Sequence, residues 1–208
     1  NHSEKNEKLC KIASPDIAVI TNIGEAHIEN FKSRKHLAEA KKEILKGAKN
    51  KFIAILPGVD DYYNFLKSSI NTKKIITFGL GEKCNIRFLK NENTYLLGEK
   101  KVTIKNQLIG EHNINNIMAA LGVAEALNIP IDISKKALER QKPIKGRLET
   151  KILVNNIILI DDTYNSNPSA MRSAIDVLAQ NKMYKILVMG DMAELGVLST
   201  KHHKDIAS

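Results

Sequence analysis

Residues 157–160 are four consecutive aliphatic side chains, and they are followed at once by Asp161 and Asp162. A run without polar residues predicts a strand buried on both faces, as in a parallel sheet that helices cover on each side. Asn167 and Pro168 predict the start of a helix, because Asn caps free helix N–H groups and Pro fits the first helical turn. Polar side chains are therefore expected between the carboxyl end of a strand and the amino terminus of a helix, where open α/β sheets bind ligands.

A second aliphatic run, at residues 186–189, ends at Gly190 and Asp191. Two such units in succession predict a βαβ pair with parallel strands and a right-handed crossover. The aspartates after both strands would then lie at one edge of the sheet. Taken singly, Asp161, Asp162 and Asp191 also fit ordinary loop and cap positions. Their place after two successive strands favours a binding site.

The rest of the chain predicts an α/β protein of two domains, residues 1–143 and 144–208, separated by a segment that contains Pro143 and Gly146. In the first domain we expect a mostly parallel sheet flanked by helices, and in the second a Rossmann-like arrangement. Short alternating segments within residues 84–105 predict an antiparallel edge or a small inserted sheet. The expected strands are residues 17–20, 52–56 and 75–78, and the expected helices are residues 3–13, 33–47, 60–69, 133–140 and 199–208, with one more after Gly110.

Composition excludes several classes of protein. The net charge is +9, but only five of the 32 basic residues are Arg and the lysines are scattered, whereas a nucleic-acid surface needs clustered charge. No apolar run approaches the roughly 18–20 residues of a membrane span. Cys10 and Cys84 lack metal-type spacing, which suits a reducing compartment. We therefore expect a cytoplasmic protein without membrane insertion or nucleic-acid binding, whose positive field favours small anionic substrates.

Two candidate sites follow the first predicted strand. Glu25, His27 and Glu29 alternate along an extended turn, so they could converge on a metal ion or a phosphate. A solvated surface histidine is the alternative interpretation. Lys41 lies beside the apolar face of its helix, where burial would disfavour its charge and make it open to modification. Its alternative is an ordinary lysine that extends its amine to water.

Two more candidates lie later in the chain. Amide-rich residues after Gly110 offer hydrogen-bond groups to a nucleobase or ribose, although Asn and His also serve as helix caps. Arg147 could bind phosphate or sugar oxygens through its forked guanidinium. The phosphate-binding patterns G-x-x-x-x-G-K-[ST] and G-x-G-x-x-G are absent. These residues therefore predict a nucleotide-type site that lacks its phosphate loop.

Residues 20–27, 40–44, 110–116 and 146–149 resemble, in order and spacing, the successive motifs of the Mur ligase family. Residues 161–168 and 190–196 are similar to the branch of that family that adds D-alanyl-D-alanine to UDP-N-acetylmuramoyl-tripeptide. The resemblance covers nearly the whole chain. It implies an ATP-dependent amide ligase of peptidoglycan precursor synthesis, in which ATP phosphorylates the substrate carboxylate and the incoming amine attacks the acyl phosphate.

The resemblance also implies roles for single residues. His27 corresponds to a ligand of the second Mg²⁺, and Lys41 to a carbamylated lysine that helps hold Mg²⁺ and position the γ-phosphate. Carbamylation replaces an ammonium by a carboxylate-like group, which explains a lysine beside a cation. The remaining implied contacts are with ATP: Asn113 and Asn116 on its adenine side, and Arg147 and Asp162 on its phosphates and ribose from the second domain.

The chain departs from the family in lacking the phosphate loop, the Glu ligand that precedes this region and the UDP-binding domain. We therefore expect an internal part of a longer, monomeric protein, which would be inactive by itself. Two alternatives stay open. One is a related ligase that adds a diamino acid, or one that adds glutamates to folate; residues 161–168 argue against both. The other is a non-catalytic nucleotide-binding protein.

Overall fold

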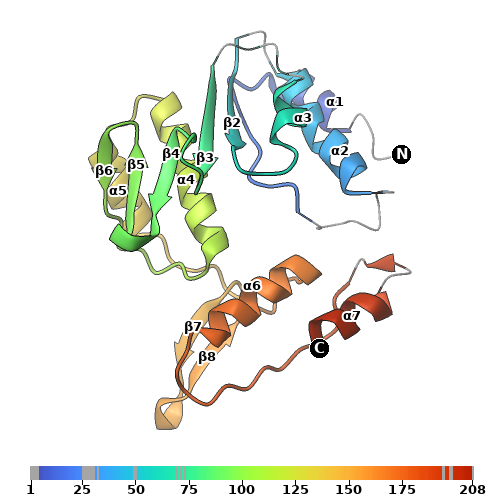
Figure 1. Ribbon diagram of the computed structural model, residues 1–208, viewed down its shortest axis with the longest axis vertical. Helices are drawn as coiled ribbons and strands as arrows, with labels where there is room; N and C mark the ends of the chain where they lie inside the picture. Colours follow the sequence, from blue (N-terminus) through green and yellow to red (C-terminus); the bar gives the residue numbers. More distant parts are fainter. Residues whose placement is uncertain are drawn as a thin grey trace. The chain divides into compact units, whose positions relative to one another are not determined.

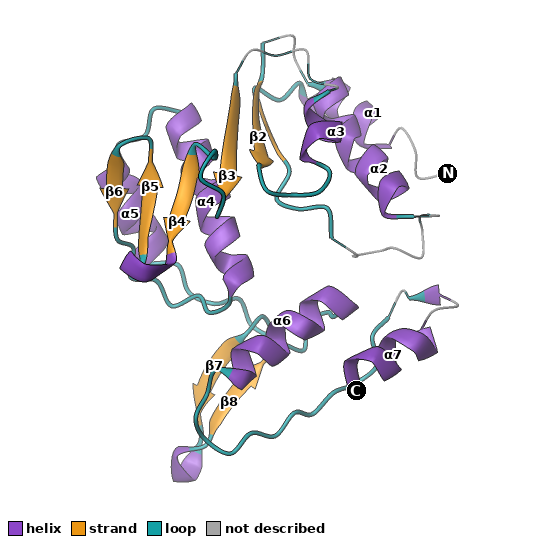
Figure 2. Cartoon of the chain, viewed as in Figure 1, coloured by secondary structure: helices purple, strands orange, loops and turns teal. Residues whose placement is uncertain are grey.

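The computed structural model describes residues 5–24, 31, 33–48, 51–68, 70, 72, 74–193, 195–196 and 199–207. They fall into two compact units, whose helices and strands are shown in Figures 1 and 2. Unit 1 lies within Asn1–Ile23, Ser33–Lys105 and Ile114–Arg140, and unit 2 within Gly24–Lys32, Asn106–Asn113 and Gln141–Ser208. The domain boundary expected between residues 143 and 144 stays a prediction.

Unit 1 contains a six-stranded sheet in which the strands follow their order in the sequence. The first four strands pair in parallel, and the last three form an antiparallel edge of the same sheet. The expected α/β fold with a mostly parallel sheet is confirmed, and the separate inserted sheet is not formed. The strands are β1 (Ile17–Val19), β2 (Ile53–Pro57), β3 (Ile75–Gly79), β4 (Ile86–Leu89), β5 (Thr94–Leu97) and β6 (Lys100–Val102).

The parallel strands β3 and β4 are joined by a short connection, residues 80–85. Fully overlapping parallel strands need a crossover of roughly a dozen residues or more. Here β4 begins where β3 ends, because the pairing is limited to Phe78 with Ile86 and Gly79 with Arg87. The Asn85 side-chain oxygen accepts hydrogen bonds from the Thr77 backbone N–H and hydroxyl, both at 2.8 Å. This local network fixes the step from one strand to the next.

Helices cover both faces of the sheet. On β2, Ala54 and Leu56 pack in one core cluster with α2 (Arg34–Gly47) and α3 (Tyr63–Lys67), while Ile55 packs in a second cluster with α4 (Glu111–Ala126). Alternate residues of a strand point to opposite faces, so a strand covered on both sides must be apolar throughout. The unbroken aliphatic run of β2 therefore follows from its central place. The shorter α5 (Ile131–Glu139) contributes partly buried side chains to the second cluster.

The first helix of unit 1, α1 (Lys5–Ala13), packs against α2. The Asn6 side chain donates to the Ala40 carbonyl at 2.9 Å, and the Asn6 backbone N–H donates to the Glu43 carboxylate at 3.1 Å. Glu43 is thus buried with a partner for its charge. At the start of α2 the Ser33 hydroxyl accepts from the His36 N–H, as expected for a helix cap.

Unit 2 contains a β-hairpin and two helices (Figure 1). β7 (Glu149–Ile152) pairs antiparallel with β8 (Ile158–Asp161), and they are followed by α6 (Pro168–Ala179) and α7 (Ser199–Ala207). The Asn167 side chain accepts a hydrogen bond of 3.0 Å from the Ala170 N–H, with Pro168 in the first turn. The start of α6 predicted from Asn167 and Pro168 is confirmed.

The parallel pair expected from residues 157–160 and 186–189 is not formed in this chain. β8 pairs antiparallel with β7, and its Ile158 and Leu159 are more than 40% exposed. In the described part of unit 2, residues 186–189 form no strand, and Val188 is 91% exposed. An aliphatic run shows a preference for extended structure, but a strand also needs a neighbour for its backbone groups. That partner is set by tertiary structure, which local sequence does not encode.

Both cysteines, Cys10 and Cys84, are free and buried. Burial raises the pKa of each thiol, which keeps both in the less reactive protonated form. Among the helices that the structure describes, none is long and apolar enough to cross a membrane.

Replacing Leu121 with Ala should destabilise unit 1 by about 2–5 kcal/mol, because it removes fully buried methyl groups and leaves a cavity. Leu127→Ala is the matched control: this leucine, shortly after the end of α4, is 56% exposed and should cost well under ~1 kcal/mol. Urea unfolding of both variants measures the difference. Equal losses of unfolding free energy would contradict the assignment of Leu121 to the core.

Candidate functional site

The first candidate site lies where β1 and β2 end. These strands are parallel neighbours, so the segments that follow them, residues 20–24 and 58–62, emerge at the same edge of the sheet. This carboxyl-terminal edge is where open α/β sheets hold their ligands. Lys41 of α2 reaches the same edge, and its amine donates a hydrogen bond of 2.9 Å to the carbonyl of Asn22. One residue of the predicted site therefore lies at the expected edge.

The two adjacent lysines of α2 have different surroundings. Burial lowers the pKa of the half-buried Lys41 amine, and the nearby Asp60 carboxylate partly opposes this shift. Burial, followed by the charge of Lys46, lowers the pKa of the Lys42 amine as well, but that amine lies over the ring of Phe65, 3.7 Å from its centroid. A lysine with a lowered pKa has a larger fraction of neutral, nucleophilic amine. Lys41 is thus suited to covalent modification while it is held in place by Asn22.

Asp60 is a residue of this site that the sequence analysis missed. One carboxylate oxygen accepts a hydrogen bond of 3.0 Å from the Ile23 N–H, and the other accepts one of 2.9 Å from the Tyr62 N–H. The segment after β1 is thereby tied to the segment after β2. The signal was present in the sequence, because Asp60 follows a predicted strand and its turn just as Asp161 and Asp162 follow another.

Arg34, at the start of α2, was missed as well. Its guanidinium donates a hydrogen bond of 3.1 Å to the Ile23 carbonyl and lies 5.5 Å from the centroid of the Tyr62 ring. An exposed ion pair of 3.7 Å joins it to Asp61. No sequence signal distinguishes Arg34 from the other charged residues at helix starts. Its role depends on the position of Ile23, which only the folded chain defines.

The candidate residues of the turn after β1, Glu25, His27 and Glu29, lie outside the described residues. Within the part of the chain that the structure describes, no three His, Cys, Asp or Glu side chains are grouped as a metal site would require. The amine of Lys41 is a hydrogen-bond donor here, so it offers a metal no ligand unless it is modified.

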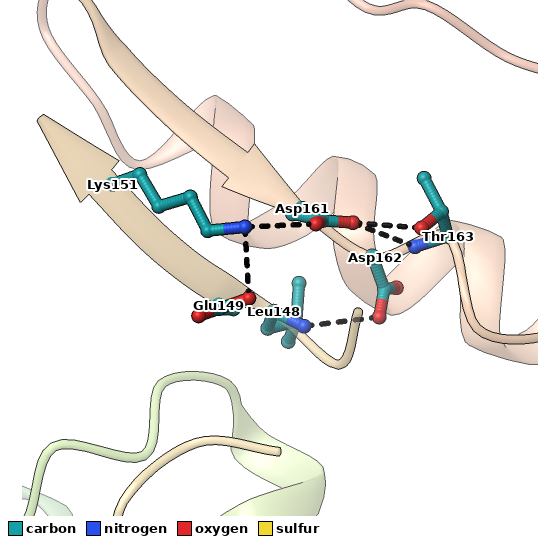
Figure 3. A network of polar contacts seen from close by, with 6 residues as sticks. All are labelled: Leu148, Glu149, Lys151, Asp161, Asp162 and Thr163. Atoms are coloured by element: carbon teal, nitrogen blue, oxygen red, sulfur yellow. Dashed lines mark hydrogen bonds and ion pairs between the residues drawn. The ribbon is translucent and has the colours of Figure 1, made fainter. Parts of the chain in front are cut away.

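The second candidate site lies in unit 2, where Asp161 and Asp162 have separate partners (Figure 3). Asp161 accepts from the Thr163 hydroxyl at 2.8 Å and forms an ion pair of 3.2 Å with Lys151, which also pairs with Glu149. The hydrogen bond from Thr163, followed by that from Lys151, lowers the pKa of the Asp161 carboxyl. Asp161 is therefore part of a network that joins β7 and β8.

Asp162 instead accepts a hydrogen bond of 3.1 Å from the Leu148 N–H, as Figure 3 shows. The neighbouring Arg147 is exposed, and its guanidinium carbon lies 4.3 Å from the centroid of the Tyr164 ring. The backbone N–H of Tyr164 donates a hydrogen bond of 2.9 Å to the Gly146 carbonyl, which holds Tyr164 in place. The structure thus brings together Arg147 and Asp162, both of which were predicted as site residues.

Gly146 allows this close approach of two chain segments. Its φ of +72° favours glycine, and a Cβ there would lie only 3.2 Å from the Tyr164 backbone nitrogen. Glycine is therefore required at position 146 by the turn that places Arg147 beside Tyr164.

The start of α4 holds the last predicted residues. The Asn113 side chain donates a hydrogen bond of 2.7 Å to the Ile109 carbonyl, and Gly110 before it has a φ of +96°. Asn116 follows one turn later on α4 and is exposed. Burial lowers the pKa of the neighbouring His112, an effect that Asp162 partly opposes. His112 is a further group near Asp162 that the sequence analysis did not assign to a site.

Comparisons with known proteins place both parts of the chain in one family. Residues 1–124 match the family model of the Mur ligase middle domain, and residues 146–208 match that of the Mur ligase glutamate ligase domain. A relative in Buchnera aphidicola subsp. Baizongia pistaciae, named UDP-N-acetylmuramoyl-tripeptide--D-alanyl-D-alanine ligase, is 36% identical over 100% of this chain and 47% of its own length. The chain thus spans less than half of that relative.

Two solved structures are similar over nearly the whole chain. A MurF structure from Acinetobacter baumannii has a TM-score of 0.86 and 33% identity, over 97% of this chain and 45% of its own. The MurF ligase of Thermotoga maritima, solved in complex with ADP, has a TM-score of 0.84 and 30% identity, over 96% of this chain and 47% of its own. Both similarities cover residues of unit 1 and of unit 2.

The pKa of His112 should lie below the ordinary histidine value of about 6.5. Asp162→Asn should lower it further, because the carboxylate that favours the imidazolium is removed. Asp161→Asn is the control and should leave this pKa unchanged. An NMR titration of the imidazole C–H signals, assigned with a His112→Gln variant, measures these shifts. A His112 pKa that rises in Asp162→Asn would contradict the proposed electrostatic interaction between Asp162 and His112.

Proposed function

This chain belongs to the Mur ligase family, and we propose that it forms part of an ATP-dependent ligase that joins D-alanyl-D-alanine to UDP-N-acetylmuramoyl-tripeptide. The observation on which the proposal depends is the identity of 36% with the Buchnera ligase of that name across the whole of this chain. Residues 161–168, which resemble the D-alanyl-D-alanine branch in sequence, support the same substrate pair. The reaction belongs to peptidoglycan precursor synthesis.

The proposed reaction has two steps. The terminal carboxylate of the tripeptide attacks the γ-phosphorus of ATP, which forms an acyl phosphate and releases ADP. The amine of D-alanyl-D-alanine then attacks the acyl carbon, so an amide bond forms, the C–O bond to phosphate breaks and inorganic phosphate leaves with the amine proton lost to water. Most of what a protein contributes to such a transfer is positioning and the stabilisation of charge.

Lys41 is the residue of unit 1 to which we assign a direct role. A neutral amine can add to CO₂ to give a carbamate and a proton, and the lowered pKa of Lys41 favours the neutral amine. The carbamate would supply the oxygen ligands that Mg²⁺ prefers, which the unmodified amine lacks. Together with His27, whose imidazole lies outside the described residues, it would hold the Mg²⁺ that neutralises phosphate charge in this chemistry.

In unit 2 we assign Arg147 and Asp162 to ATP. The exposed guanidinium of Arg147, lying against Tyr164, has donors suited to phosphate oxygens. The Asp162 carboxylate, held by the Leu148 N–H, is an acceptor suited to ribose hydroxyls. Asn113 and Asn116 of α4 are assigned to the adenine side. The ADP found in the Thermotoga relative supports a nucleotide for this protein too.

We further propose that the protein is a cytoplasmic monomer that neither inserts into membranes nor binds nucleic acid. Two other functions stay open for the activity assay to decide.

A related ligase would accept a diamino acid or glutamate in place of the dipeptide, and a non-catalytic protein would bind ADP without turnover. Residues 161–168 favour the dipeptide over the first of these.

The protein that carries this sequence should release phosphate from ATP only when Mg²⁺, UDP-N-acetylmuramoyl-tripeptide and D-alanyl-D-alanine are all present. Mass spectrometry should find the tripeptide extended by one D-alanyl-D-alanine. The chain of 208 residues alone should show no such activity, because it lacks a phosphate loop. Ligation of a diamino acid or glutamate instead, or ADP binding without any turnover, would overturn the proposed substrate pair or the catalytic function.

Lys41→Ala should lower the ligation rate roughly 100-fold or more, since a preorganised charge at the reacting phosphate is lost. Added short carboxylic acids should restore part of the rate by replacing the carbamate. Lys42→Ala is the matched control and should retain nearly full activity, because Lys42 lies over Phe65 instead. Full activity in Lys41→Ala would rule out the assignment.

A further inference from the structure

We propose that Asp60 is a positioning residue for Lys41 and that it acts through the peptide group joining Asn22 and Ile23. Its catalytic meaning rests on the role proposed above for Lys41. The contacts themselves belong entirely to unit 1 and can be tested without any activity.

The Asn22 carbonyl and the Ile23 N–H belong to one peptide group, and each has a side-chain partner. Asp60 accepts from the N–H at 3.0 Å, and Lys41 donates to the carbonyl at 2.9 Å. A trans peptide is planar, and its N–H and C=O point in opposite directions. When Asp60 fixes the direction of the N–H, it therefore also fixes the direction of the carbonyl that receives the Lys41 amine.

Three further contacts keep this peptide from turning. The second Asp60 oxygen accepts from the Tyr62 N–H at 2.9 Å, so the carboxylate itself is anchored. Arg34 donates to the Ile23 carbonyl at 3.1 Å and holds the next peptide group. The Ile23 side chain is only 1% exposed and packs in the core cluster of α2 and α3. The acceptor for Lys41 is thus a rigid group.

The same arrangement makes the carbonyl a better acceptor. A hydrogen bond from a peptide N–H to a carboxylate is stronger than one between neutral groups, and it polarises the C=O of the same peptide. A carbamate nitrogen at Lys41 would keep one N–H, so this hydrogen bond could persist after modification. It would then set the plane of the carbamate and the direction of its oxygens.

A simpler role for Asp60 would be that of a turn residue. Its bond to the Tyr62 N–H, two residues on, is what an Asx turn provides. A turn role does not require the other oxygen to bond to Ile23, which is 37 positions away in the sequence. That long-range bond is the contact that joins Asp60 to the environment of Lys41.

The test compares how fast an acylating reagent labels Lys41 and Lys42 in the folded chain, measured by peptide mass spectrometry. In Asp60→Ala the ratio of Lys41 to Lys42 labelling, after each rate is corrected for that amine's pKa from the pH profile of labelling, should rise about five-fold, because the loss of one net hydrogen bond frees the Lys41 amine. Asp61→Ala is the matched control, because the carboxylate of this neighbouring residue is 80% exposed and forms an ion pair of 3.7 Å with Arg34. That variant should leave the ratio unchanged.

Asp60→Asn covers the case in which Asp60→Ala fails to fold, since it keeps the size of the side chain but loses the charge. Its amide nitrogen would face one of the two N–H donors, so the ratio should still rise about two-fold or more. An unchanged ratio in a folded Asp60 variant, or an equal rise in Asp61→Ala, would overturn the proposal. If the ratio rises while the protein that carries this sequence proves to have no ligase activity, the proposed function fails and the positioning contact stands.

Discussion

The parallel pairing of β1 with β2 is the constraint on which the first site depends. Because the two strands run in the same direction, the segments after them leave the sheet at one edge, and Asp60 can bond to Ile23 across a large separation in sequence. The helix between these strands, α2, carries Lys41, whose amine donates a hydrogen bond to the Asn22 carbonyl at that edge. In a pair of antiparallel neighbours the corresponding segments would leave at opposite ends, and these groups could not meet.

The surroundings of Lys41 combine two opposing electrostatic effects. Burial disfavours the ammonium, and the carboxylate of Asp60 favours it, with burial the larger effect. An amine in this balance stays anchored by a hydrogen bond yet has a neutral fraction that can react. Lys42, next in the chain, lies over an aromatic ring instead. Adjacent residues on a helix point in different directions, so one lysine faces the sheet edge and the other does not.

In unit 2 the adjacent residues Asp161 and Asp162 likewise point in different directions and have different partners. Alternation along an extended segment sends neighbouring side chains to opposite sides. Asp161 joins the ladder of β7 and β8 through Lys151, whereas Asp162 turns toward the Leu148 N–H beside Arg147 (Figure 3). The first carboxylate therefore has a structural partner of opposite charge. The second is held by a neutral backbone donor, and its charge favours the imidazolium of His112.

The sequence by itself determined the local structure and the family. Helix starts at Ser33 and Asn167, the apolar strands of the first sheet and its antiparallel edge all follow from short-range preferences, as do the motifs that contain Lys41, Arg147 and Asp162. Tertiary structure decided the rest: the antiparallel partner of β8, the absence of a strand among the described residues 186–189, and the places of Asp60 and Arg34 around Ile23. The physical reason is that caps and alternation involve neighbours in sequence, whereas strand pairing and the contacts of Ile23 join residues far apart in the chain, which no local pattern specifies.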